Sequence, residues 1–160
     1  MDEETEDISV KMPMNFMNHT AFLLSFNNVN MLLEEPDSCP LAFHALKSGI
    51  ITEEEVDDLM AKVEPCYDGD LIFSFDELIS LYTIVELSAK YMLSDKGDEF
   101  LKKVETLHAD DAKQNTWTAD GYKGLLNMSS AFVKRCTENL AEFEIFRARK
   151  EELDKLNEWI

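Results

Sequence analysis

The stretch Ser74–Leu93, SFDELISLYTIVELSAKYML, decides the fold. Ser74 and, three residues later, Glu77 form a capping box, which is the sequence signature of a helix N-terminus. The apolar residues that follow, from 78 to 93, fall on nearly every side of the expected helix. A helix that is apolar all round is a buried one. We therefore predict that helix 78–93 is the central element of the structure.

The sequence upstream of this helix predicts further elements. Ile8–Met12 alternates apolar and polar residues, as in a short strand or an extended lead-in, and Pro13 suits the first turn of a helix. We expect a helix over Asn15–Leu33, with a strand around Ala21–Phe26 as the competing interpretation. A short helix is expected over Pro40–Lys47.

Three further regions are expected to be helical. Thr52 and Glu55 form a second capping box, which opens a helix that ends near Val63. After the central helix, we expect a helix over about 96–108 and a polar loop over about 109–117. Apolar residues at spacings of three and four then mark a last helical region, from 122 to 156, which one long helix would satisfy.

The scarcity of helix breakers favours one fold class. All four prolines lie at or before position 65, and the chain has five glycines. We predict a mostly α protein, a compact bundle of about five to six helices around helix 78–93. One short β segment near 71–75 is an open alternative for that stretch. Residues 1–7 are expected to form a disordered acidic tail. Residues 8–160 are expected to form a single helical domain.

The charge is large and uneven. The 160 residues include 33 acidic and 15 basic side chains, which give a net charge of −18. Residues 1–77 hold 18 of the acidic side chains and only 3 of the basic ones. A field of that sign repels nucleic acid and anionic lipid and attracts basic proteins. We therefore expect a basic protein partner and neither nucleic acid nor a membrane. The alternative explanation is that the acidity only supports solubility.

The cysteines and the N-terminus bear on the compartment. Cys39, Cys66 and Cys136 are widely spaced and odd in number, which fits free thiols in a reducing compartment better than a disulfide framework. The acidic stretch 1–7 does not read as a signal peptide. No apolar run approaches the roughly 20 residues of a membrane span. We expect a cytoplasmic protein.

The sequence carries no recognisable catalytic motif. The patterns GxSxG, GxxxxGK[ST], GxGxxG and HExxH are all missing from it. His19, His44 and His108 lie far apart in the sequence, and carboxylate pairs are too common to single out a general acid and base. We expect no catalytic residue, no cofactor and no enzyme activity. An enzyme whose site is assembled from scattered residues is the alternative.

The region 52–82 reads as a helix, an acidic loop, a short apolar run and a second helix. It resembles an EF-hand, because a loop of that family's length ending at Glu77 places acidic and polar residues at ligand positions. The candidate metal ligands are Asp68, Asp70, Ser74 and Glu77. The sequence departs from the family at Cys66, in place of the first ligand, and at Leu71, in place of glycine. The resemblance implies a degenerate calcium-binding protein as an alternative function.

The leading hypothesis is a non-enzymatic protein-binding domain of inhibitor, immunity or adaptor type. Its acidic surface would engage a basic partner, in the sharpest form a nucleic-acid-handling enzyme whose phosphate site it occupies. The candidate partner-binding residues are Glu53, Glu54, Asp57, Asp58, Asp68 and Asp70. A further alternative is a structural subunit, in which the apolar stripe over 122–146 pairs two copies as a homodimer.

Overall fold

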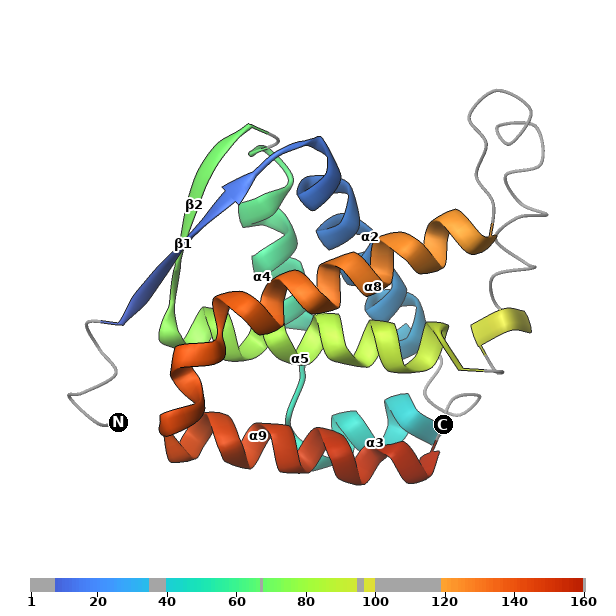
Figure 1. Ribbon diagram of the computed structural model, residues 1–160. Helices are drawn as coiled ribbons and strands as arrows, with labels where there is room; N and C mark the ends of the chain where they lie inside the picture. The colour runs from blue at the N-terminus through green and yellow to red at the C-terminus, as the bar shows by residue number, and fades with distance from the viewer. Residues whose placement is uncertain (1–7, 35–39, 67, 95–96, 100–118, 160) are drawn as a thin grey trace.

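Helix α5, Phe75–Met92, lies at the centre of the computed structural model, with the other helices packed around it (Figure 1). The structure describes residues 8–34, 40–66, 68–94, 97–99 and 119–159. The predicted acidic tail 1–7, the loop 109–117 and most of the predicted helix 96–108 lie outside the described residues. None of the described helices is long and apolar enough to cross a membrane.

The prediction that α5 is buried on all sides is confirmed. Every residue from Leu81 to Ala89 is buried, and Leu81 and Val85 are 0% and 1% exposed. The Ser74 hydroxyl accepts the backbone N–H of Glu77, and the Glu77 carboxylate accepts that of Ser74. These two bonds form the capping box that begins the helix.

Three helices precede α5 in the chain. Helix α2 covers Phe16–Glu34, so the helical interpretation of this stretch is right and the competing strand at 21–26 is wrong. Helix α3 covers Pro40–Ser48, and helix α4 covers Glu53–Val63. Each of the three buries apolar residues in the core that surrounds α5.

Two short strands pair at one side of the bundle. Strand β1, Ser9–Met14, runs antiparallel to β2, Gly69–Ser74, with Ser9 opposite Ser74 and Met14 opposite Gly69. The β segment near 71–75 is thereby confirmed. The expected helical role of Pro13 is wrong, because this residue lies inside β1 and α2 begins only at Phe16.

The C-terminal region is not one long helix. Helix α8, Ala119–Cys136, crosses α5, the chain turns through the 3-10 helix η2, Glu138–Glu142, and α9, Glu144–Lys155, returns along the other side of α5 (Figure 1). The 3-10 helix η3, Leu156–Trp159, follows and packs near α3. The fold is therefore mostly α with one small antiparallel sheet, as predicted.

Polar side chains of α5 connect it to the surrounding elements. Asn28 of α2 donates a hydrogen bond to Ser88, at 3.2 Å. Ser130 of α8 donates one to the buried Glu86, at 2.7 Å. Arg149 of α9 donates to Thr83, at 2.8 Å. A buried polar group that lacks a partner is costly, so these bonds help to fix how each helix sits on α5.

Candidate functional site

Helix α4 turns one face to the core and the other to solvent. Its N-terminus is fixed by Thr52, whose hydroxyl accepts the backbone N–H of Glu55 at 3.2 Å. Val56, Leu59 and Val63 recur at helical spacing and are buried. The opposite side carries four exposed acidic residues, and we call it the acidic face. Its members are Glu53, Glu54, Asp57 and Asp58.

The carboxylates of the acidic face have no cationic partner among the described residues. Asn30 of α2 donates a hydrogen bond to Asp57 at 3.3 Å, which leaves the charge of that carboxylate in place. Acidic residues in a first helical turn are stabilised by the helix dipole. The acidic face is therefore a compact group of hydrated negative charges on a firmly capped helix.

Glu55 belongs to the same turn but points inward. Its carboxylate accepts a hydrogen bond from the Ser80 hydroxyl of α5 at 2.9 Å, and a longer one from Thr52 at 3.3 Å. This residue therefore connects α4 to the central helix. The three consecutive glutamates of the sequence thus divide into two that face solvent and one that holds the fold.

The remaining predicted partner-binding residues lie beyond the other end of α4. Asp68 and Asp70 are exposed at the start of β2. Asp70 lies 3.7 Å from the Lys11 ammonium of β1, so part of its charge is balanced there. A helix of 11 residues is about 16 Å long, so the six predicted residues form two groups and not one site.

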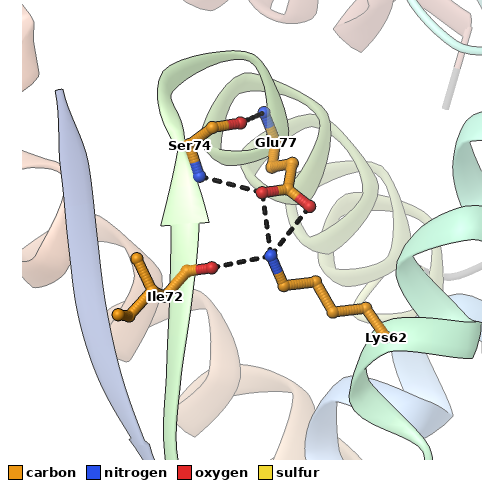
Figure 2. A network of polar contacts seen from close by, with 4 residues as sticks. All are labelled: Lys62, Ile72, Ser74 and Glu77. Atoms are coloured by element: carbon orange, nitrogen blue, oxygen red, sulfur yellow. Dashed lines mark hydrogen bonds and ion pairs between the residues drawn. The ribbon is translucent and has the colours of Figure 1, made fainter. Parts of the chain in front are cut away.

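The predicted metal ligand Glu77 is held by a lysine. Lys62 Nζ of α4 lies 2.8 Å and 2.9 Å from the two Glu77 carboxylate oxygens and donates to the Ile72 carbonyl at 2.6 Å (Figure 2). Burial acts to raise the pKa of Glu77. The Lys62 ammonium and the Ser74 backbone N–H outweigh it and lower the pKa below its ordinary value of 4.5. Glu77 is thus a charged partner of Lys62 in this structure.

The other predicted metal ligands are spread along a strand. Asp68 precedes β2, whereas Asp70 and Ser74 lie within it, where a calcium-binding loop would have to curl around the ion. Among the residues that the structure describes, no group of three or more His, Cys, Asp or Glu side chains could hold a metal ion. Calcium binding stays a prediction that only a measurement can test.

The Lys62–Glu77 pair also covers an open edge of the sheet. Pro13 has no N–H, so its pair with Asp70 is of the type without ladder hydrogen bonds, and so is the Lys11–Ile72 pair two positions away. The Ile72 carbonyl therefore points away from β1, where Lys62 reaches it. Exposed strand edges invite pairing with other chains. Lys62 and Glu77 thus hydrogen-bond to backbone groups of β2 that a strand of another chain would need for pairing.

The homodimer stripe over 122–146 is partly used inside the chain. Leu140 and Phe146 are buried in the core, and Phe132, Cys136 and Phe143 pack against it. Burial raises the pKa of the Cys136 thiol, although Arg135 acts to lower it. Pairing of two copies through this stripe stays a prediction.

The histidines make separate contacts. A ring nitrogen of His19 lies 2.9 Å from the Glu64 carbonyl, and His44 packs edge-on against Phe43. His108 lies outside the described residues.

Burial, with the charges of Glu86 and Asp154, raises the pKa of Tyr82 to about 12, so this hydroxyl stays protonated at neutral pH.

One side of α2 exposes large apolar residues, and none of them is among the predicted partner-binding residues. Phe16, Met17 and Met31 are 76%, 49% and 43% exposed. By contrast, Met12 and Met14, which lie on β1 just before this helix, are buried in the core. A signal for the exposed face existed in the sequence, since Phe16–Leu33 contains no Asp, Glu, Lys or Arg.

Comparisons of the chain with models of known families, with curated proteins and with solved structures give no match.

Proposed function

We propose that this chain is a non-enzymatic protein-binding domain, of inhibitor, immunity or adaptor type, whose acidic face engages a basic protein. The observation that carries the proposal is the acidic face of α4. Four exposed carboxylates lie within six residues of one capped helix, and no described lysine or arginine pairs with them. By contrast, the Glu77 carboxylate that caps α5 is paired with Lys62.

The net charge of the chain has the same sign as the acidic face. The net charge is −18, and residues 1–77 hold most of the excess. Such a field speeds the encounter with a basic partner and makes the encounter sensitive to salt, because the Debye length falls from about 30 Å at 0.01 M to about 3 Å at 1 M. The carboxylates of the acidic face carry charge of the same sign as the phosphates that a nucleic-acid-handling enzyme binds, which supports the inhibitor form of the proposal.

The test uses poly-L-lysine as a basic probe and two matched variants. The first neutralises the acidic face. It combines Glu53→Gln, Glu54→Gln, Asp57→Asn and Asp58→Asn. The second removes four charges from exposed positions elsewhere. It combines Glu138→Gln, Glu142→Gln, Glu144→Gln and Glu151→Gln. Both variants have the same net charge, so any difference between them reflects where the charges lie.

We expect neutralising the acidic face to weaken binding at least about tenfold more than the control does, and binding to fall steeply between about 50 and 500 mM salt. The affinity would be measured by fluorescence anisotropy. Equal losses in the two variants would show that only the net charge matters and would overturn the proposal. Binding that ignores salt would overturn it as well.

A further inference from the structure

The two edges of the small sheet can be told apart by their backbone groups. Residues of an antiparallel pair that exchange no ladder hydrogen bonds turn their N–H and C=O groups away from each other, toward the outer edges of the sheet. The pairs of this type alternate along β1 and β2. They are Ser9–Ser74, Lys11–Ile72 and Pro13–Asp70.

The outer edge of β2 is closed by side chains of the same molecule. The Lys62 ammonium donates to the Ile72 carbonyl at 2.6 Å, and the Glu77 carboxylate accepts the Ser74 N–H at 2.9 Å. Figure 2 shows both side chains on the side of β2 that faces away from β1. A strand of another chain would have to displace them before it could pair with β2.

The outer edge of β1 is closed only at its end. Pro13 has no N–H, and its carbonyl accepts the side-chain amide of Asn18 at 3.0 Å. Ser9 and Lys11 are exposed, and no described residue hydrogen-bonds to their outward N–H and C=O groups. This edge therefore offers two donors and two acceptors at alternate positions, which is what an added strand needs.

Strand β1 presents these groups from a fixed position. Met12 and Met14, on its inner side, are 0% and 3% exposed, and Val10 packs against the core. The Lys11 ammonium lies 3.7 Å from the Asp70 carboxylate of β2, so this side chain leans toward β2 and away from the open edge. A strand that is already ordered lowers the entropy that a partner must lose on binding.

The charge of this part of the chain selects the occupant of the edge. Residues 1–77 hold 18 acidic and 3 basic side chains, and five of residues 1–7, which precede β1, are Asp or Glu. A second copy of the chain would bring a further net charge of −18, which like-charge repulsion opposes. A basic segment is attracted by the same field.

We propose that the outer edge of β1 binds an extended basic segment of a partner protein, which joins the sheet as a third strand. Backbone hydrogen bonds to Ser9 and Lys11 hold the segment, and its lysines or arginines face a negatively charged half of the chain. The edge shares no residue with the acidic face of α4. The inference therefore goes beyond the proposed function and stands without it.

The probe is a synthetic peptide of about eight residues in which lysine alternates with valine or threonine, so that it is basic and favours an extended backbone. A second peptide has the same sequence, with N-methyl groups on two consecutive central amides. Neighbouring amides of a strand point to opposite sides, so this peptide loses a donor whichever edge it presents. The two peptides carry equal charge, so any preference between them measures backbone pairing.

Two variants of the protein locate that pairing. Lys11→Pro removes an outward N–H and no hydrogen bond to β2, and Pro13 already occupies the same kind of position in this strand. Lys11→Thr removes the same charge and keeps the N–H. We expect both variants to keep the circular dichroism spectrum of the wild type. A difference between them in peptide affinity then reports the N–H at position 11.

We expect the wild-type protein to bind the unmodified peptide at least about tenfold more tightly than the N-methylated one, as measured by fluorescence anisotropy. The Lys11→Pro variant should bind the unmodified peptide at least about fivefold more weakly than Lys11→Thr does. Equal affinity of the wild type for the two peptides would overturn the inference. Equal affinity of the two variants for the unmodified peptide would overturn it as well.

Hydrogen exchange followed by NMR tests the wild-type protein without any substitution. Bound peptide should slow the exchange of the Ser9 and Lys11 amides at least about fivefold, and that of the Val10 and Met12 amides, which already face β2, much less. Unchanged exchange at Ser9 and Lys11 would contradict the inference. Slow exchange of both in the free protein, together with a dimeric mass in analytical ultracentrifugation, would assign the edge to a second copy and overturn it.

The proposed function and this inference fail by different results. The variant that neutralises the acidic face should keep the preference for the unmodified peptide, because the β1 edge is unchanged in it. The proposed function can therefore fail in its own test with poly-L-lysine while this preference persists. Loss of the preference in that variant would show that the peptide binds at the acidic face and would overturn the inference.

Discussion

Helix α5 and the acidic face of α4 use polar residues in opposite ways. On α5, Thr83, Glu86 and Ser88 are buried, and each has a hydrogen-bond partner on a different helix. On the acidic face, the exposed carboxylates have no described cationic partner. These polar groups of α5 are paired within the fold, whereas the four carboxylates of the acidic face are left to solvent or to a partner protein. Substitutions on α5 should therefore lower the stability of the fold, whereas substitutions on the acidic face should lower the affinity for a basic partner.

The largest effect is expected at Leu81, which is fully buried in α5. Leu81→Asp would place an unpaired charge in the core, which costs about 5 kcal/mol or more and is comparable to the whole stability of a small domain. We expect the variant to be unfolded in circular dichroism at room temperature. A cooperative melt near the wild-type temperature would show that α5 is not the centre of the core.

A smaller loss is expected at Arg149, which connects α9 to the rest of the fold. Its guanidinium donates to the Thr83 hydroxyl and to the Ile50 carbonyl at 3.0 Å. Arg149→Met keeps much of the side-chain volume and removes both bonds, so we expect a loss of about 2 kcal/mol in urea unfolding. Arg147→Met, at an exposed position of the same helix, is the control and should stay within about 0.5 kcal/mol.

A still smaller loss is expected at the Lys62–Glu77 pair, and this loss depends on pH. The folded-state pKa of Glu77 is lowered, so its contribution to stability is present above the ordinary value of 4.5 and is lost as the pH falls through the folded pKa. Glu77→Gln should cost about 1 kcal/mol at pH 7, through the cap and the ion pair together. In urea unfolding, the difference in the free energy of unfolding between the wild type and the variant should be smaller at pH 3 than at pH 7. A difference that is the same at both pH values would mean that the charge of Glu77 does not contribute to stability.

The smallest effect on stability is expected on the acidic face. Asp58 is exposed and has no described cationic partner, so Asp58→Asn should change the free energy of unfolding by less than about 0.5 kcal/mol. The affinity for poly-L-lysine should fall while the stability stays the same. A large destabilisation at this position would place Asp58 among the residues that hold the fold.

The helix starts could be predicted because their signals are local. Thr52 and Ser74 cap the helices that follow them, and the apolar residues of α5 surround its axis. The turn after Cys136 could not be predicted, because the buried residues Leu140 and Phe146 continue the spacing of three and four through it. No glycine or proline marks the change of direction there.

The candidate site was only partly predictable. That Glu53, Glu54, Asp57 and Asp58 share one face follows from helical spacing alone. The role of Glu77 did not follow, because its partner Lys62 comes from another helix and the pairing depends on how α4 packs against β2. The pairing of β1 with β2 joins residues that are about sixty positions apart, and nothing in either local sequence specifies that register.

The central place of α5 also governs the order in which the chain can fold during its synthesis. Helices α2, α3 and α4 leave the ribosome before α5, and side chains such as Phe22 and Val56 are buried in the core that surrounds it. At about 5–20 residues per second, the 18 residues of α5 need roughly one to four seconds to appear. Throughout that time the first half of the nascent chain presents apolar surface to solvent or to a chaperone. A translational pause placed before codon 75 would lengthen this exposed period, whereas one placed far enough after codon 92 for α5 to have left the ribosome would allow the N-terminal helices to pack against it.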